Sequence, residues 1–120
     1  MSKKILLVED EPDLRELLKS ELELASYSVV AASCGDEAYR IFLDHRFDLV
    51  ISDLRMNRGG GLQLLTRLRA DGHRTPFILM SGYSDFEEAD AAKMGVSHLL
   101  HKPFTLDQFS RIVKEVLDHK

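Results

Sequence analysis

The sequence predicts an α/β domain built on a parallel five-stranded sheet with helices on both faces. Three observations support this fold class. Five short apolar runs alternate with segments of helical periodicity, the connections between them are short, and several runs are almost continuously hydrophobic. Strands and helices that alternate in this way form a parallel sheet with right-handed crossover connections.

The five apolar runs are the predicted strands, and they occupy residues 5–8, 28–32, 49–52, 77–80 and 98–101. Three of them are near-continuous hydrophobic stretches, which is typical of parallel strands covered on both faces. We expect the strand order 2-1-3-4-5, which is the order of flavodoxin-like doubly wound folds.

The first three helical segments are indicated by apolar residues spaced three and four apart. Pro12 suits the first position of the first helix, because the N–H that proline lacks has no partner there. The stripes comprise Leu14, Leu17, Leu18 and Leu22 in the first helix, Ala38, Ile41 and Phe42 in the second, and Leu62, Leu65 and Leu68 in the third.

The last two helices are indicated mainly by their ends. Ser84 and Glu87 have the spacing of a capping box before a weakly amphipathic segment over residues 86–94, and Gly95 suits its end. Thr105 and Gln108 have the same spacing before the final helix. Its apolar stripe comprises Phe109, Ile112, Val113, Val116 and Leu117.

Length and composition indicate one globular domain over residues 1–120. The formal net charge is −4 and the basic residues form no stripe, so we do not expect this chain alone to bind nucleic acid. No apolar run is long enough to cross a bilayer. Cys34 is the single cysteine, which excludes an internal disulfide and favours a reducing, cytoplasmic setting, with the thiol partly buried.

The first, third, fourth and fifth predicted strands are each followed by polar residues that could share one site. In a doubly wound sheet, ligands bind at the carboxyl ends of the strands, where the strand order reverses. Glu9 and Asp10 follow the first strand, and Asp53 follows the third. Ser81 and Lys102 follow the fourth and fifth. If the first and third strands are neighbours, the three acidic side chains converge on one point.

Three converging carboxylates repel one another unless a positive charge compensates them. An oxygen-only site of this kind suits Mg²⁺. A hard cation, the amine of Lys102 and the hydroxyl of Ser81 around Asp53 suit a phosphoryl group, whose transfer depends on positioning and charge stabilisation. Asp53 is then the carboxylate nucleophile. Taken singly, each residue has an ordinary alternative role as a solvated surface charge or a turn former.

These motifs resemble those of the receiver domains of bacterial response regulators, along the whole chain. The resemblance implies that Asp53 accepts a phosphoryl group from a histidine kinase or a histidine phosphotransfer protein. It also implies that Lys102 pairs with the phosphoryl oxygens and that Ser81 hydrogen-bonds to them. The matching stretches are Ile5-Leu6-Leu7-Val8-Glu9-Asp10-Glu11, Asp48-Leu49-Val50-Ile51-Ser52-Asp53-Leu54, Met80-Ser81-Gly82 and Lys102-Pro103-Phe104.

The resemblance also implies a metal site. Asp10, Asp53 and the backbone carbonyl of Arg55 are expected to bind Mg²⁺, with Glu9 acting through a metal-bound water. The loop that follows Asp53 and includes Arg55 ends in three consecutive glycines at residues 59–61. These glycines raise the entropy cost of ordering the loop. We therefore expect weak Mg²⁺ affinity before phosphorylation.

Leu99 departs from the resemblance, because the family usually has an aromatic residue three positions before the lysine. Coupling through a rotating aromatic ring is therefore not expected here. His98 and His101 lie three apart, too few ligands for a metal site. We expect His101 to share an outward face with Leu99, on the surface that contacts partners.

The resemblance implies that phosphorylation changes the face formed by the predicted helix over residues 86–94, the strand over residues 98–101 and the final helix. A downstream protein or an output domain would read this face, and a homodimer through it stays open. So does the choice between a stand-alone receiver and a piece of a longer regulator. The chain is not expected to be an enzyme beyond its own phosphorylation and dephosphorylation.

Three other functions are open at this point. A small aspartyl-phosphate phosphatase usually needs an acid two residues after its nucleophile, where this chain has Arg55. A flavin-binding electron carrier needs a phosphate loop after the first strand, and the acids at residues 9–11 would repel that phosphate. A phosphorylation-independent adaptor would not need the acidic cluster.

Overall fold

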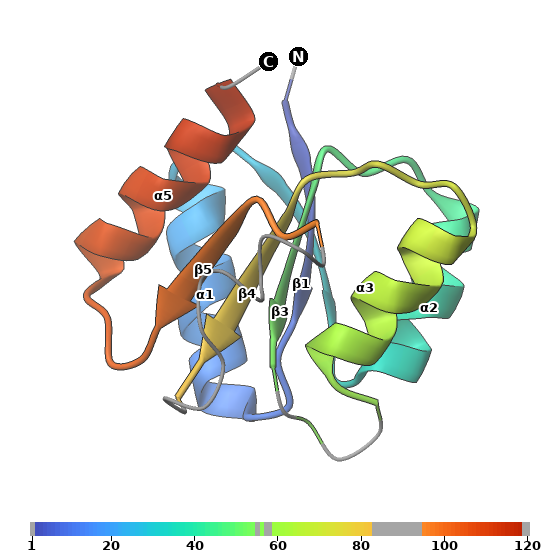
Figure 1. The fold of residues 1–120 in the computed structure, drawn as a ribbon. Helices are drawn as coiled ribbons and strands as arrows, with labels where there is room; N and C mark the ends of the chain where they lie inside the picture. The colour runs from blue at the N-terminus through green and yellow to red at the C-terminus, as the bar shows by residue number, and fades with distance from the viewer. Residues whose placement is uncertain (1, 55, 57–58, 83–94, 119–120) are drawn as a thin grey trace.

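The computed structural model describes residues 2–54, 56, 59–82 and 95–118. Five parallel strands form one sheet in the order β2-β1-β3-β4-β5, which confirms the predicted fold class and strand order (Figure 1). The strands are β1 (Lys4–Val8), β2 (Ser28–Ala32), β3 (Leu49–Asp53), β4 (Phe77–Ser81) and β5 (His98–His101). β3 and β4 each extend one residue beyond their predicted ends.

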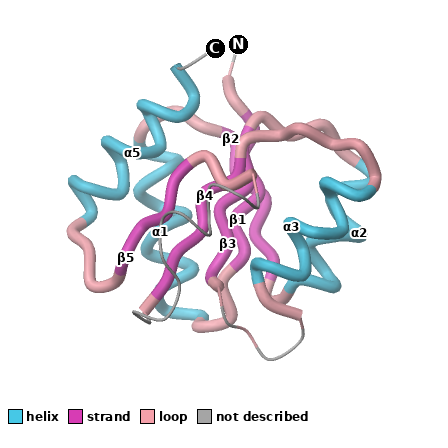
Figure 2. The backbone as a smooth tube through the Cα atoms, viewed as in Figure 1, coloured by secondary structure: helices cyan, strands magenta, loops and turns pink. Residues whose placement is uncertain are grey.

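Helices cover both faces of the sheet (Figure 2). One face carries α1 (Pro12–Leu24) and α5 (Leu106–Asp118), and the other carries α2 (Gly35–Asp44) and α3 (Gly61–Ala70). The predicted helix over residues 86–94 and its capping pair, Ser84 and Glu87, lie outside the described residues. The carboxyl ends of the strands meet at one edge of the sheet, opposite the two chain termini (Figure 1).

Alternate residues of each strand pack into two separate cores. In β1, Ile5 and Leu7 join the core under α1 and α5, while Leu6 and Val8 join the core under α2 and α3. All four side chains are fully buried. This arrangement explains why the central strands are continuous hydrophobic runs, since helices cover both faces of β1, β3 and β4.

Helix α1 differs from its predicted stripe at one position. Leu18 and Leu22 are buried, and Leu14 packs against the same core. Leu17 is 50% exposed, so its place in the predicted stripe was wrong. Residues four apart lie on one side of a helix, and the contact line of α1 follows that spacing alone.

The predicted starts of α1 and α5 are confirmed. Pro12 begins α1. The Thr105 hydroxyl accepts a hydrogen bond from the backbone N–H of Gln108 at 3.0 Å, and the Gln108 side chain accepts one from the N–H of Thr105 at 2.9 Å. This reciprocal pair is a capping box at the start of α5. Gly95 has a φ of +85°, a conformation that glycine adopts without strain, but the helix that it was predicted to end lies outside the described residues.

Strand β5 does not present Leu99 outward. Leu99 is 6% exposed and packs in the core under α2 and α3, while Leu100 packs in the opposite core. His98 and His101 are exposed at the two ends of the strand. The expectation that Leu99 and His101 share an outward face was therefore wrong for Leu99, because β5 is short and its two central residues serve the two cores.

Candidate functional site

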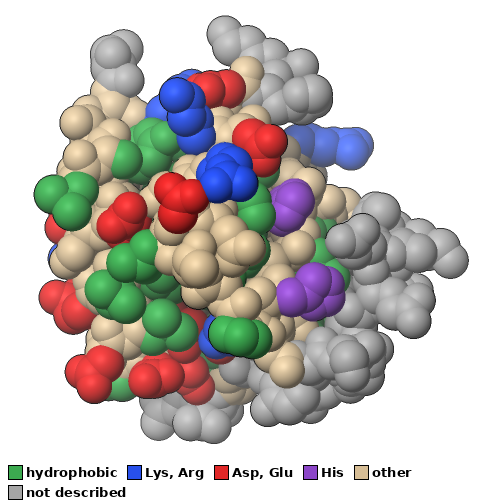
Figure 3. All heavy atoms as spheres, turned by 90° about the vertical axis from the view of Figure 1, so that its left-hand side faces the viewer, with side chains coloured by type: hydrophobic (Ala, Val, Ile, Leu, Met, Phe, Trp, Pro, Cys, Tyr) green, Lys and Arg blue, Asp and Glu red, His purple; other side chains and the backbone are tan. Residues whose placement is uncertain are grey.

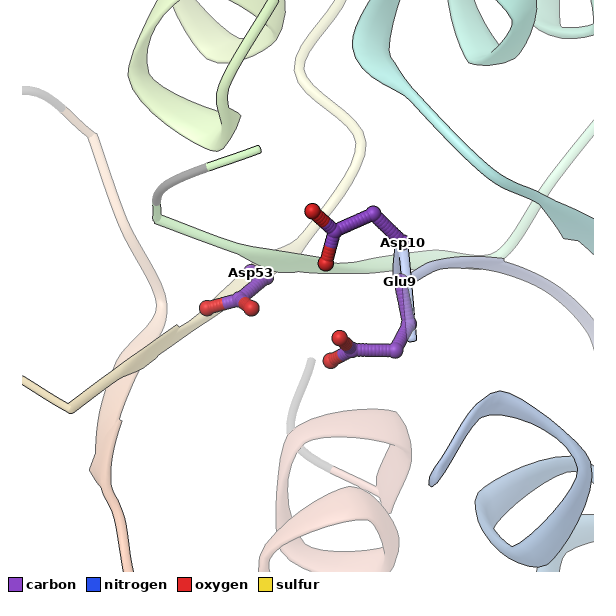
Figure 4. A group of neighbouring side chains, drawn as sticks. All are labelled: Glu9, Asp10 and Asp53. Carbon is purple, nitrogen blue, oxygen red and sulfur yellow. The ribbon is translucent and has the colours of Figure 1, made fainter. Parts of the chain in front are cut away.

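Neighbouring strands β1 and β3 bring three carboxylates together. Val8 is paired with Ser52, so the next residues of each strand, Glu9 and Asp53, emerge side by side. Each of Glu9, Asp10 and Asp53 offers an oxygen, and these oxygens all lie within 4.8 Å of one another. In Figure 4 the side chains of Glu9 and Asp10 extend from the end of β1 toward Asp53. The predicted acidic cluster is thus present at the carboxyl edge of the sheet.

Lys102 lies directly against this cluster. Its Nζ donates a hydrogen bond to Asp53 Oδ2 at 3.0 Å and lies 3.6 Å from Glu9 Oε1. Its backbone N–H donates to the carbonyl of Ser81 at 2.7 Å. Burial alone would lower the pKa of Lys102, but the carboxylates of Asp53 and Glu9 outweigh it and raise the pKa above its ordinary value. The lysine is therefore a fixed positive charge beside Asp53.

Glu9 is the most deeply buried of the three acids, at 1% exposed. Burial and the charge of Asp53 raise the pKa of Glu9 from 4.5 to about 7, although Lys102 opposes the shift. Its Oε2 accepts a hydrogen bond from the N–H of Glu11 at 3.2 Å. Its buried Oε1 has no hydrogen-bond partner within the described part of the chain, and Lys102 at 3.6 Å is an ion pair rather than a hydrogen bond.

The donor set fits a hard divalent cation. Among the residues that the structure describes, three carboxylates face one nearby ammonium, and one buried carboxylate oxygen lacks a hydrogen bond. A buried charged oxygen is costly unless another group compensates it. Oxygen-only donors with two or three carboxylates are characteristic of Mg²⁺ and Ca²⁺ sites. The residues at this edge can therefore hold such an ion.

Ser81 ends the strand next to β3. Its neighbour Met80 is paired with Asp53, and Ser81 is 1% exposed. A Cβ built on Gly82 would meet the Lys102 side chain at 3.9 Å, so the end of β4 lies alongside that side chain. The structure thus brings Ser81 to the same edge as Asp53 and Lys102. Arg55 lies outside the described residues.

The sequence reasoning missed two contacts around the cluster. Arg15 Nη1 donates a hydrogen bond to the backbone carbonyl of Glu9 at 2.8 Å. Gly61 begins α3 so close to β3 that an added Cβ would lie 2.5 Å from the carbonyl oxygen of Asp53. A basic residue in the first turn of a helix that follows an acidic run is a sequence signal for the first contact, whereas no local pattern indicates the second.

Comparison with known proteins identifies the family. The profile described as "Response regulator receiver domain" matches residues 5–114. The chain belongs to the response regulator receiver domain family. The family is not a classical enzyme family, and the acidic cluster fits its phosphorylation site.

Individual relatives agree with this assignment. The chain is 35% identical to the regulatory protein AtoC of Escherichia coli over 115 residues, which is 95% of this chain and 25% of AtoC. It superposes on the Francisella response regulator 1452 receiver domain with a TM-score of 0.91 and 25% identity, covering 98% of both chains. The TrrA response regulator of Thermotoga maritima, solved in complex with Mg²⁺–BeF, gives a TM-score of 0.85 and 34% identity, covering 95% of this chain and 98% of that one.

The receiver corresponds to part of a longer protein in the curated relatives. The chain spans between about a quarter and a half of their length. Among the described residues, no helix is long and apolar enough to cross a membrane.

Proposed function

We propose that Asp53 accepts a phosphoryl group from a phosphohistidine donor in a Mg²⁺-dependent reaction, and that residues 1–120 act as one receiver unit. The observation that carries this proposal is the geometry of Asp53. Its carboxylate is hydrogen-bonded to Lys102 at 3.0 Å and shares a 4.8 Å cluster with Glu9 and Asp10. A carboxylate nucleophile, a fixed ammonium and a metal-binding donor set are the parts that phosphoryl transfer requires.

In this reaction an oxygen of Asp53 donates an electron pair to phosphorus. The new O–P bond forms as the P–N bond of the phosphohistidine breaks. The imidazole leaves with the electron pair of the P–N bond and takes up a proton. Lys102 supplies a positive charge next to the acceptor, which stabilises the charge that spreads over the phosphoryl oxygens. The hydroxyl of Ser81 is proposed as a further hydrogen-bond donor to those oxygens.

We propose Asp10 and Asp53 as metal ligands, with Glu9 acting through a bound water and the carbonyl of Arg55 as a further ligand. A bound Mg²⁺ would neutralise charge on the transferring phosphoryl group. This proposal is supported by the buried Oε1 of Glu9, which has no hydrogen-bond partner among the described residues. Weak affinity in the unphosphorylated state stays a prediction, and a titration that gives a site much tighter than millimolar would contradict it.

The consequences for signalling are proposals of the same kind. Phosphorylation adds roughly −1.5 to −2 charge beside Ser81 and Lys102, and charge of this kind can bias a two-state surface. We propose that the surface formed by the predicted helix over residues 86–94, β5 and α5 responds, and that an output domain or a separate protein binds it. Leu99 is buried in the core under α2 and α3, so a response at β5 that involves this residue is a repacking of leucine and not the rotation of an aromatic ring.

Partners and location follow from the proposed chemistry. A sensor histidine kinase or a histidine phosphotransfer protein is the proposed donor, and a cytoplasmic setting is proposed with it. Figure 3 shows the face over α5, where acidic, basic and apolar side chains are intermixed and the basic side chains form no stripe. This charge pattern supports the proposal that the receiver by itself does not bind nucleic acid. A homodimer through the surface formed by the predicted helix over residues 86–94, β5 and α5 is a further proposal.

Mass spectrometry tests the proposal directly. The protein is incubated with Mg²⁺ and acetyl phosphate or phosphoramidate, and the intact mass is measured. We expect a single phosphoryl adduct that Asp53→Asn abolishes and that chelation of Mg²⁺ prevents. Asp13→Asn is the matched control, because Asp13 is an exposed acid in the first turn of α1. Equal labelling of the Asp53→Asn protein would refute the assignment.

A further inference from the structure

The side chain of Arg15 extends from the first turn of α1 to the acidic loop, which comprises residues 9–11 between β1 and α1. Its Nη1 donates a hydrogen bond to the backbone carbonyl oxygen of Glu9 at 2.8 Å, and the side chain is partly buried. A hydrogen bond from a guanidinium to a carbonyl is charge-assisted and is stronger than a neutral one. This contact therefore holds the backbone of the acidic loop, not one of its carboxylates.

The bonded carbonyl belongs to the peptide unit that joins Glu9 to Asp10. A peptide unit is planar, so fixing its oxygen fixes the direction in which the chain leaves toward Asp10. Asp10 is less buried than its two acidic neighbours. The position of its carboxylate thus depends strongly on the backbone of Asp10. Arg15 restrains that backbone through its hydrogen bond to the carbonyl of Glu9.

Other contacts fix the rest of Glu9. Its N–H donates to the carbonyl of Ala32 at the end of β2 at 3.1 Å, and its Oε2 accepts from the N–H of Glu11 at 3.2 Å. The hydrogen bond from Arg15 adds a third restraint, at the backbone carbonyl of Glu9. Together these contacts hold the loop in the conformation that gathers the three carboxylates.

We infer that Arg15 is a positioning residue for the metal site, acting through the Glu9–Asp10 peptide. This inference rests on the proposed function, since it concerns the affinity of the same acidic cluster for Mg²⁺. Partners of this kind, which orient the ligands of a metal, typically change metal affinity by about 10- to 100-fold when removed. Because Arg15 holds a backbone group and not a ligand atom, we expect the lower end of that range, about tenfold.

The charge of Arg15 and its positioning role predict opposite changes in Mg²⁺ affinity when this arginine is removed. A positive charge near three carboxylates competes with a cation, so its removal should tighten Mg²⁺ binding if charge is the only effect. If Arg15 positions the loop, its removal should weaken Mg²⁺ binding despite the loss of a competing charge. The sign of the change therefore decides between the two roles.

The test measures Mg²⁺ affinity by calorimetry for the wild-type protein, Arg15→Ala and Arg15→Lys. The chain has no tryptophan, so intrinsic tryptophan fluorescence cannot report binding. We expect Arg15→Ala to bind about tenfold more weakly and Arg15→Lys to recover part of the loss, because lysine keeps the charge and a donor. Arg111→Ala is the matched control, an exposed arginine on α5 that bonds to Asp107. Unchanged or tighter binding by Arg15→Ala overturns the inference.

A second measurement is made without metal. Amide hydrogen exchange of Asp10 and Glu11 should be faster in Arg15→Ala than in the wild type, while exchange in the central strands should not change. Equal exchange rates at Asp10 and Glu11 in Arg15→Ala and the wild type would contradict the positioning role. Faster exchange throughout Arg15→Ala would show that this variant is unfolding. In that case the Mg²⁺ affinity of Arg15→Lys, compared with that of the wild type, tests the positioning role. If the wild-type protein is labelled at Asp53 but Arg15→Ala binds Mg²⁺ normally, only this inference fails. If the wild type neither binds Mg²⁺ nor is labelled, the proposed function fails as well.

Discussion

Gly61 lies directly against the backbone of Asp53. A Cβ at Gly61 would stand 2.5 Å from the Asp53 carbonyl oxygen, 2.6 Å from Leu79 Cδ1 and 3.1 Å from Ser52 Oγ. The N–H of Gly61 also donates to the carbonyl of Leu54 at 3.1 Å. The first residue of α3 is therefore packed against the backbone of the residue that we propose as the phosphoryl acceptor.

This contact predicts a strong effect of the smallest possible substitution. Gly61→Ala should lower the free energy of unfolding by about 1–3 kcal/mol, because the added methyl group overpacks a filled site. It should also slow labelling of Asp53 by acetyl phosphate, since the backbone of the acceptor has to shift. Gly82→Ala is the control for stability, because a Cβ there meets Lys102 only at 3.9 Å. Equal stability of Gly61→Ala and wild type in urea titrations would rule out the close contact.

Removal of the Lys102 charge should have opposite effects on metal binding and on labelling. Lys102→Met leaves Asp53 and Glu9 without their ammonium, so the affinity for Mg²⁺ should rise. The labelling rate should fall by about 100-fold or more, as when one preorganised charge-stabilising group is removed. Lys114→Met, an exposed lysine on α5, should change neither quantity. Weaker Mg²⁺ binding by Lys102→Met would contradict the prediction.

The raised pKa of Glu9 predicts an unusual pH dependence of stability in the absence of metal. The folded protein binds a proton at Glu9 up to about pH 7, whereas the unfolded chain releases it near the ordinary value of 4.5. The contribution of Glu9 to stability is therefore fully present below about pH 4.5 and is lost as the pH rises through about 7, with a magnitude on the order of 3 kcal/mol.

Thermal or urea unfolding across this pH range measures the effect. Glu9→Gln should flatten the dependence, because glutamine does not titrate. Saturating Mg²⁺ should also flatten it, since a bound cation favours the ionised carboxylate. The free energy of unfolding could also change by the same amount between pH 5 and 7 in the wild type and in Glu9→Gln. That result would show that Glu9 titrates normally and would contradict the prediction.

The capping box of α5 should contribute measurably to stability. Thr105→Ala removes the acceptor for the N–H of Gln108, and we expect the free energy of unfolding to fall by about 1 kcal/mol. Thr66→Ala is the matched control, because the Thr66 hydroxyl bonds to the carbonyl of Leu62 inside α3, where such a bond adds little. Similar stabilities of the two variants would mean that the capping bonds do not form in solution.

The burial of Leu99 separates it from the histidines on the same strand. Leu99→Ala should lower the free energy of unfolding by about 2–5 kcal/mol, because it leaves a cavity under α2 and α3. His101→Ala, at an exposed position two residues later, should change it by about 0.5 kcal/mol or less. Comparable losses in both variants would contradict the orientation of β5.

Local sequence patterns determined the strands, most helix positions and the identity of the clustered acids. Hydrophobic runs and helical stripes act over a few residues, so Ile5 and Phe109 could be assigned to cores from their neighbours alone. The capping box of Thr105 and Gln108 is likewise contained within four residues. The acids at the ends of β1 and β3 followed once the strands were placed, since parallel strands end at one edge.

The tertiary structure alone decided how closely these groups meet. The reach of Arg15 to the carbonyl of Glu9, the contact of Gly61 with Asp53 and the burial of Leu99 all depend on how helices and an edge strand settle on the sheet. The pKa of Glu9 depends on every charge and surface around it in three dimensions. Such quantities arise from contacts between residues far apart in the chain, and periodicity along the chain carries no record of those distances.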